Sequence, residues 1–446
     1  MTAHAGDTVI HIEQQLVRVL GIAFGLAVVI GGMVGQGIMR SPGIVAGAVG
    51  APLAIMAVWL VGGLLSALDA FSTAELAASH PRAGGPYALA RRAFGPLAGT
   101  MIGWTDWLQG VVSIGFIAVV FGEYVHELGL AERAPVGLIS VLLLASIGAL
   151  HWHGTRVCGA SQTTATALKA LMMLGLVAAL ALAPGAPADP SPGPSPAVTL
   201  AGVVIALRLT LTTYAGWNAS CYFSEEMHEP ERNVARATFM GIGLVTLLYL
   251  AVNAALLHVM TPAQLASSKL PAADALQRTL GGSSGLVITI IAVISVGAIA
   301  NLMCMQFTRV AFAVSRDGAL PAFLSQVAPG GTPRLAMVTT IGFAMLFAAS
   351  GTYETLVTIA AVPGSLILLA IDLAAMRLRR IEPDLPRPFR MPLFPLPALV
   401  GALCNIAIIA AMVWQDPANS LIGIVLLACV GVVYIARDAL VRRAPA

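Results

Sequence analysis

The chain consists of long apolar runs separated by short polar segments. Each run has about 18 or more residues and is long enough to cross a hydrocarbon core of about 30 Å as a helix. The sequence therefore predicts an all-α membrane protein with twelve transmembrane helices. The predicted spans are residues 16–39, 52–75, 96–122, 135–151, 159–183, 199–222, 236–260, 284–308, 335–350, 355–376, 395–414 and 419–436.

Composition supports the same class. Hydrophobic residues make up 58% of the 446 residues and charged residues only 10%, whereas a soluble domain carries about 25% charged residues. The net charge of +3 gives no indication of a nucleic-acid partner. The five cysteines lie in or beside apolar spans without metal-ligand spacing, so we expect no metal, no cofactor and no disulfide framework.

Basic residues predict the orientation. Eighteen of the 24 lysines and arginines fall in segments on one side of the predicted topology, and four fall in the opposite loops. Lysine and arginine accumulate in cytoplasmic loops. We therefore expect an integral protein of the inner or plasma membrane with both termini in the cytoplasm.

Two predicted helices are interrupted by glycine-containing clusters. One cluster covers residues 31–37 (GGMVGQG) and the other residues 212–218 (TTYAGWN). They lie in the first and sixth spans, on either side of the Pro/Ala-rich loop 184–198, where two five-helix halves would divide. Paired interruptions at matching positions are typical of a transporter's central site. The alternative is that these glycines only permit close helix packing.

Several motifs resemble the amino acid–polyamine–organocation (APC) superfamily, and most closely its L-type amino acid transporter branch. They are IGGMVGQGI at 30–38, STAEL at 72–76, PRAGGPY at 81–87, AFG at 93–95, YAGWN at 214–218, EEMHEPERN at 225–233 and SRDG at 315–318. The resemblance implies an inverted five-plus-five repeat with helices 1 and 6 broken at the midplane. The implied divisions are a cytoplasmic segment 1–15, a first repeat 16–183, an external loop 184–198, a second repeat 199–380, two additional helices in 381–436 and a cytoplasmic tail 437–446.

The resemblance also implies where an amino acid would bind. The amides of Gln36 and Gly37, at the positive end of a half-helix, would take the carboxylate. The carbonyls of Met33, Thr212 and Ala215 would take the amine. The remaining expected contacts come from the broken segments and are Val34, Gly35, Tyr214, Gly216 and Asn218.

Lys169 lies in the middle of the fifth span and is one of only two lysines in the chain. A charged lysine at a helix centre costs about 2.5–3.5 kcal/mol on insertion scales, so it needs a partner. The resemblance implies that its ammonium replaces a sodium ion and contacts the carbonyls near Gly31 and Gly32 and the hydroxyl of Ser295. The alternative is a lysine that reaches the interface or acts as a static strut.

Further ionisable residues fall in or near the spans. Intramembrane charges are functional hypotheses by default, and we assign these residues to an outer vestibule or a proton path without choosing between them: Arg208, Asp69, Asp106 and Asp372. A second group near the cytoplasmic ends predicts an inner gate of ion pairs, with a solvated charged loop as the alternative: Glu75, Glu225, Glu226, Glu229, Arg82, Arg232 and Arg236.

These features predict an amino acid permease that works by alternating access, without sodium, by proton coupling or exchange. A polyamine or cationic amino acid exchanger of the same fold is the first alternative, and a membrane solute sensor is the second. We expect no enzymatic activity, because no nucleophile–base or metal motif lies in the spans. The loop 123–135 contains no cysteine, so we expect no disulfide-linked accessory subunit. The sequence is compatible with a homodimer in the lipid membrane and does not decide the oligomeric state.

Overall fold

The structure of the protein is a computed structural model that describes residues 16–35, 37–131, 133–185, 198–281, 284–350 and 353–443. The expected segment 1–15 and most of the expected loop 184–198 lie outside these residues. The helices of the first half are α1 (Ile22–Met33), α2 (Gly37–Val49), α3 (Pro52–Ser79), α4 (Pro86–Phe94), α5 (Pro96–Glu127), α6 (Val136–Trp152) and α7 (Thr155–Ala181).

The second half begins with α8 (Leu200–Thr213) and the 3₁₀ helix η1 (Trp217–Phe223). The helices that follow are α9 (Pro230–Val259), α10 (Pro262–Ser267), α11 (Pro271–Leu280), α12 (Ser284–Arg316), α13 (Arg334–Ser350), α14 (Tyr353–Ile381), α15 (Leu396–Gln415) and α16 (Pro417–Arg443), with the 3₁₀ helix η2 (Ala322–Ser325) before α13. Several helices begin with proline, whose fixed φ suits the first helical position.

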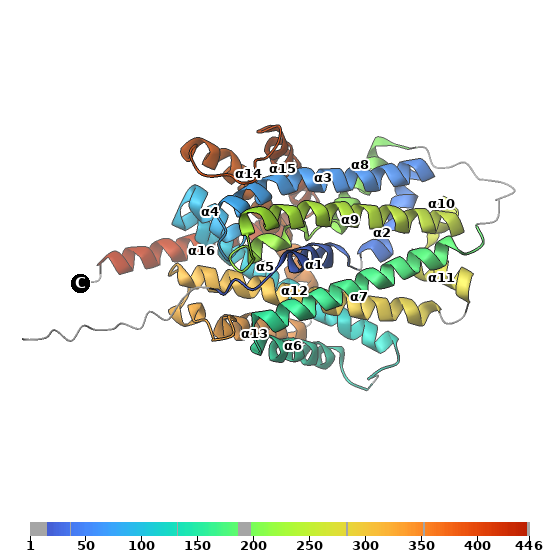
Figure 1. Ribbon diagram of the computed structural model, residues 1–446, viewed down its shortest axis with the longest axis horizontal. Coiled ribbons are helices and arrows are strands. Elements are labelled where there is room, and N and C mark those ends of the chain that lie inside the picture. The colour runs from blue at the N-terminus through green and yellow to red at the C-terminus, as the bar shows by residue number, and fades with distance from the viewer. Residues whose placement is uncertain are drawn as a thin grey trace, which may run out of the picture.

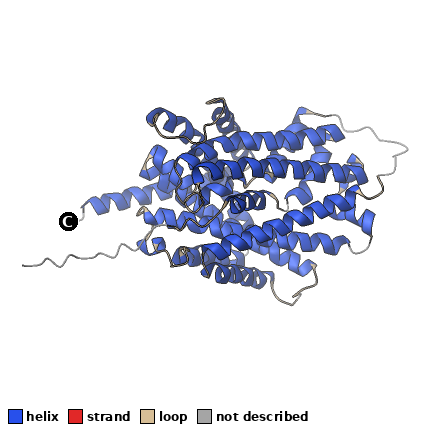
Figure 2. Ribbon diagram, in the orientation of Figure 1, coloured by secondary structure: helices blue, strands red, loops and turns tan. Residues whose placement is uncertain are grey.

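Many of the long helices, among them α3, α7 and α9, run side by side along the longest axis of the molecule (Figure 1). Helix and loop account for the whole described chain, apart from one isolated bridge between Leu20 and Met227 (Figure 2). Eight helical segments in the described residues are long and apolar enough to cross a membrane, and the bent pair α1 and α2 makes a ninth. Two shorter apolar helices are α6 and α13. The prediction of an all-helical membrane protein is therefore confirmed.

Some boundaries differ from the sequence prediction. The sequence predicts that the first span ends at residue 39, but α2 continues to Val49 and includes Arg40. The long helix α12 continues beyond the expected residue 308 to Arg316. The short helices α4, α10 and α11 lie between the predicted spans, because segments of six to ten residues give no transmembrane signal.

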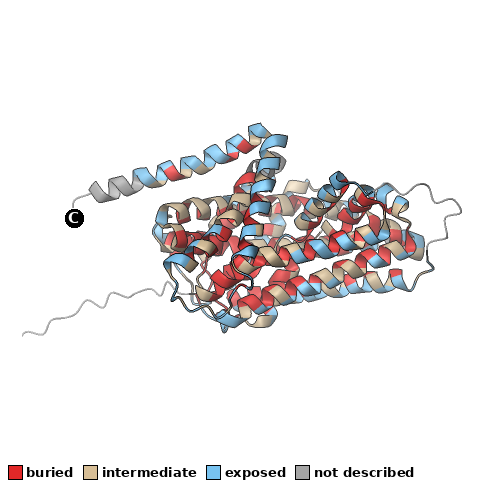
Figure 3. Cartoon of the chain, turned by 90° about the horizontal axis from the view of Figure 1, so that it is seen from above, coloured by how far each residue is buried: buried red, intermediate tan, exposed pale blue. Residues whose placement is uncertain are grey.

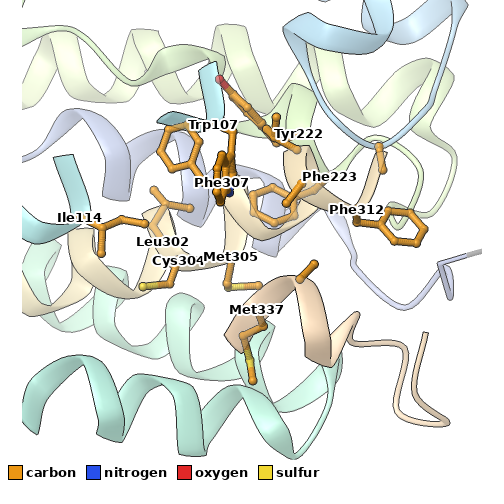
Figure 4. Packing of buried hydrophobic residues seen from close by; sticks show 14 of the residues in the cluster. Trp107, Ile114, Tyr222, Phe223, Leu302, Cys304, Met305, Phe307, Phe312 and Met337 are labelled. Carbon is orange, nitrogen blue, oxygen red and sulfur yellow. The ribbon is translucent and has the colours of Figure 1, made fainter. Parts of the chain in front are cut away.

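Apolar residues cover the outside of the bundle as well as its core. Leu53, Leu182 and Leu200 are each more than 80% exposed, and exposed residues follow the outer faces of the helices (Figure 3). Large exposed apolar surfaces are rare on soluble monomers. Inside, one buried cluster includes residues of η1, α5 and α12 (Figure 4), and a second includes residues of α1, α3 and α9. The two broken helices contribute to both clusters.

Candidate functional site

The first predicted interruption is a break between two helices. Helix α1 ends at Met33, and its C-cap Val34 has extended backbone angles (φ −75°, ψ 98°). Helix α2 begins at Gly37, and its axis is bent by 47° from that of α1. Gln36, expected to bind a carboxylate, lies outside the described residues. The glycines of this segment weaken the helix, because glycine loses more conformational freedom on folding than any other residue.

The second interruption is also a break. Helix α8 ends at Thr213, residues 214–216 form a turn, and η1 begins at Trp217. Gly216 has φ 106°, in the left-handed region that side-chain-bearing residues rarely adopt. A glycine at this position therefore allows the chain to change from α8 to η1.

The two breaks touch each other. A Cβ atom added to Gly32 would lie 2.9 Å from the carbonyl oxygen of Gly216, and one added to Gly216 would lie 2.7 Å from that of Gly32. Tyr249 of α9 joins the same two segments, because its hydroxyl donates to the carbonyls of Met33 at 2.7 Å and Thr213 at 3.2 Å. The Met33 carbonyl, expected to bind an amine, thus already accepts one hydrogen bond.

We predict that Gly216→Ala abolishes most transport. The left-handed backbone alone costs a non-glycine residue about 1–2 kcal/mol, and the added methyl group would overlap the backbone of Gly32. The measurement is the initial rate of amino acid uptake per folded protein in liposomes. Gly243→Ala in α9 is the matched control, because an added Cβ there meets nothing within 4 Å. Uptake by Gly216→Ala at the control rate would contradict the importance of this contact.

Lys169 of α7 reaches the end of α1. Its ammonium group donates to the carbonyl of Gly31 at 2.9 Å and to the carbonyl of Val34. The last carbonyls of a helix have no intrahelical partner and lie at the negative end of its dipole, so they attract a cation. Ser295 of α12 donates to the same Val34 carbonyl at 3.5 Å. The lysine side chain is 1% exposed, and these partners are peptide carbonyls rather than a carboxylate.

The structure brings together part of the expected lysine site. Lys169, Gly31 and Ser295 converge as the resemblance implies, but Val34 provides the second carbonyl. The backbone of Gly32 instead faces Gly216.

Accessible surface remains beside the breaks. Thr212 and Ala215 are exposed, and Gly35, Gly37 and Asn218 are partly exposed. Tyr214, by contrast, is fully buried, and its hydroxyl donates to the Trp59 carbonyl at 3.1 Å. Its hydroxyl therefore holds α8 against α3.

The ionisable residues of the predicted spans lie in three different parts of the structure. Arg208 is at the surface and donates to Gln415 of α15 at 3.3 Å. The carboxylates of Asp69 and Asp372 face the same point of α15, since a Cβ on Gly401 would lie 3.0 Å from the first and 2.8 Å from the second. Asp106 lies elsewhere, on α5 beside η1.

A buried ion pair involves the segment that follows η1. Arg309 of α12 donates to both carboxylate oxygens of Glu226, each at 2.9 Å, and the two side chains are 1% and 0% exposed. Thr155 at the start of α7 donates to Glu226 at 3.3 Å. The pair thus connects α12, α7 and the segment after η1.

Further ion pairs surround the C-terminal end of α12. Arg316 donates to both oxygens of Glu225, at 2.7 and 3.0 Å, and the Ala83 amide donates to the same carboxylate at 2.8 Å. Burial raises the pKa of Glu225, but these hydrogen bonds outweigh it and hold the pKa below its usual value. Further along the surface, Asp317 pairs with Arg82 at 3.4 Å.

The sequence predicted acidic members of this network but not their partners. Glu225 and Glu226 pair with arginines of α12, 91 and 83 residues away, rather than with Arg232 or Arg236 nearby in sequence. Glu75 pairs with Arg379 at 2.5 Å. No local sequence signal indicates such distant partners.

The chain segment before α1 is tied to the same place. The amides of Val19 and Leu20 both donate to the carbonyl of Glu226 at 3.0 Å, and the amide of His228 donates to the carbonyl of Leu20 at 2.8 Å. The backbone entering α1 and the backbone leaving η1 are thus paired beside the buried ion pair.

A membrane-spanning bundle with two broken helices in contact, closed by ion pairs on one side, is the architecture of a secondary transporter. The family model described as "Amino acid permease" matches residues 20–435. The chain therefore belongs to the amino acid permease family, and this membership confirms the prediction of a transporter rather than an enzyme.

Curated relatives agree with the family. The chain is 28% identical over 430 residues to the b(0,+)-type amino acid transporter 1 of Mus musculus, covering 94% of this chain and 88% of the relative. It is 27% identical over 427 residues to the cystine/glutamate transporter of Homo sapiens, covering 92% and 83%. It is 26% identical over 413 residues to the serine/threonine exchanger SteT of Bacillus subtilis (strain 168), covering 91% and 93%.

Proposed function

We propose that the protein carries amino acids across the membrane by alternating access, without sodium, through proton coupling or exchange. The observation that carries this proposal is the contact between the two helix breaks, with Lys169 bound to the carbonyls at the end of α1. The names of the relatives, which include amino acid transporters and exchangers, support an amino acid as substrate.

An uncharged site at the breaks suits a zwitterion. The start of α2 supplies amide groups and a positive dipole end for a carboxylate, while the carbonyls near the ends of α1 and α8 favour an ammonium group. Ala215 is exposed there, so its carbonyl is a better candidate for the amine than that of Met33, which accepts from Tyr249, or that of Thr212, which accepts from the Ala215 amide at 3.3 Å.

The proposal extends to the topology. Counting each broken pair once, α1 with α2 and α8 with η1, and adding the ten longer helices α3, α5–α7, α9 and α12–α16 gives twelve crossings. The five-plus-five repeat at 16–183 and 199–380, and the cytoplasmic position of both termini, rest on the paired breaks and the distribution of basic residues.

The replacement of sodium by Lys169 has a direct physical basis. A sodium ion between helices would be held by carbonyl and hydroxyl oxygens. The ammonium group lies against the carbonyl oxygens of Gly31 and Val34, and the Ser295 hydroxyl donates to the same Val34 carbonyl. A buried cation bound this way leaves no vacant charge site for a metal ion. We therefore expect transport to be the same in sodium and in choline.

The test is uptake by purified protein in liposomes. Labelled L-serine, L-leucine, L-arginine and putrescine are supplied in sodium or choline buffer, with and without unlabelled compound inside. We expect the zwitterionic amino acids to enter, faster by counterflow, and at equal rates in both buffers. Sodium-stimulated uptake would contradict the role of Lys169, uptake of putrescine alone would favour a polyamine exchanger, and binding without counterflow would favour a sensor.

A further inference from the structure

Asp106 is a buried carboxyl group with one oxygen unaccounted for. It lies on α5 and is 4% exposed. The Tyr222 hydroxyl donates to Oδ1 at 3.0 Å, whereas Oδ2 has no hydrogen-bond partner among the described residues. An ionised carboxylate in such a place, without a cation or a full set of donors, is costly.

The surroundings of Asp106 hold no compensating cation in the described part of the chain. The titratable groups facing it are Tyr222 and Cys221, both on η1. From α12 the ring of Phe307 packs on the same face of α5, and the arginines of that helix turn to Glu225 and Glu226. From α4, Tyr87 packs against Gly103 of α5, but its hydroxyl donates to Asp317. The contacts that α5 makes with Thr340 of α13 and with Gly364 of α14 involve neutral groups.

The hydrogen bond of Asp106 joins α5 to η1, which belongs to the second broken helix. Tyr222 and Phe223 project from η1 into the apolar cluster that also holds Trp107 and Phe307 (Figure 4). Glu226, which forms the buried ion pair with Arg309, lies only four residues beyond Tyr222. The end of η1 therefore links Asp106 to the buried ion pair, which lies on the expected cytoplasmic side.

We propose that Asp106 is a proton-binding residue: the free oxygen Oδ2 takes a proton when the cytoplasmic side is closed, and returns it to water when that side opens. This deepens the proposed function and rests on it, because it names the ion that would be coupled to transport. The proton comes from and returns to water, so no other reactant is involved. Protonation removes the buried charge and thereby favours the closed arrangement of η1.

The sign of the pH dependence follows. As the pH rises, Asp106 loses its proton, the closed state with a buried carboxylate becomes unfavourable, and a cycle that must pass through that state slows. An inward proton gradient should accelerate net uptake. Because one pH unit changes the protonated fraction by up to about tenfold, the effect should reach several-fold across neutral pH.

The experiment compares wild type with Asp106→Asn, an uncharged mimic of the protonated form, in proteoliposomes. We expect wild-type uptake of labelled L-serine or L-leucine to rise with an inward proton gradient. Asp106→Asn should retain counterflow, lose the gradient response and show a flat pH profile. Tyr222→Phe should keep a pH profile moved to higher pH, because the lost hydrogen bond favours the ionised form. The same substitution at the exposed end of α15, Asp416→Asn, is the matched control.

A second measurement does not need a substrate. Infrared difference spectra of the purified protein between acidic and alkaline pH should contain a carbonyl band of a protonated carboxylic acid that is absent in Asp106→Asn. Asp106→Asn and the control Asp416→Asn should both melt at temperatures close to that of wild type, since neither substitution removes an ion pair. An unchanged gradient response in Asp106→Asn, or an unchanged band, would overturn the proposal. If the proposed transport function fails but Asp106 binds a proton, no amino acid will be taken up and the infrared band will still be present.

Discussion

Replacing Lys169 by alanine should eliminate amino acid transport almost completely. The ammonium group donates to the carbonyls of Gly31 and Val34 at the point where α1 ends. A hydrogen bond involving a charged group contributes about 1.5–3 kcal/mol, so losing both should lower the population of the correctly broken helix by at least about tenfold. The measurement is initial uptake per folded protein, in parallel with the melting temperature.

The other lysine provides the control for this experiment. Lys269 lies between α10 and α11, on the expected outer surface, and Lys269→Ala removes the same charge away from the breaks. We expect it to transport at nearly the wild-type rate. Transport by Lys169→Ala at nearly the wild-type rate would show that the lysine is not needed for the site to function.

Breaking the buried pair of Arg309 and Glu226 should cause the largest loss of stability. Removing one partner of a buried ion pair leaves an uncompensated charge and costs about 3–5 kcal/mol. We therefore expect Arg309→Met and Glu226→Gln each to lower the free energy of unfolding in detergent by about that amount. The accessible measurement is denaturant unfolding or, where it is irreversible, the shift of the melting temperature relative to wild type.

The double variant distinguishes pairing from general damage. If the two side chains act together, the combined loss in Arg309→Met with Glu226→Gln will be smaller than the sum of the single losses, as in a double-mutant cycle. The partly exposed pair of Arg92 and Glu382, 28% and 31% exposed, is the comparison. Solvent-exposed pairs contribute about 0–1 kcal/mol, so Glu382→Gln should reduce stability less than a change in the fully buried pair. Equal effects at both pairs would contradict the role of burial.

The sequence predicted the positions of both breaks because their causes are local. Glycine weakens a helix wherever it occurs, so the clusters at 31–37 and 212–218 mark the interruptions without any knowledge of the partners. Lys169 was also recognisable alone, since an intramembrane charge requires oxygen partners. The preference of its ammonium group for Val34 over Gly32 depends on how α1 unwinds after Met33, which the sequence does not specify.

Contacts between segments far apart in the sequence could not be predicted from the sequence. Tyr249 lies in an ordinary apolar helix, and no sequence pattern indicates that its hydroxyl joins the carbonyls of Met33 and Thr213. The partners of Glu225 and Glu226 depend on the packing of α12 against η1. The uncommitted oxygen of Asp106 is likewise a product of packing, since the sequence shows only an aspartate inside a span.

The backbone pairing of Val19 and Leu20 with Glu226 has a consequence for the order of events during a cycle. These hydrogen bonds join the backbone entering α1 to the backbone leaving η1, so a pathway between these two segments cannot widen by moving side chains alone. The segment before α1 must first separate from the segment after η1, which breaks these backbone hydrogen bonds. Shortening or stiffening that segment should therefore alter how often the pathway opens, while the affinity for substrate stays the same.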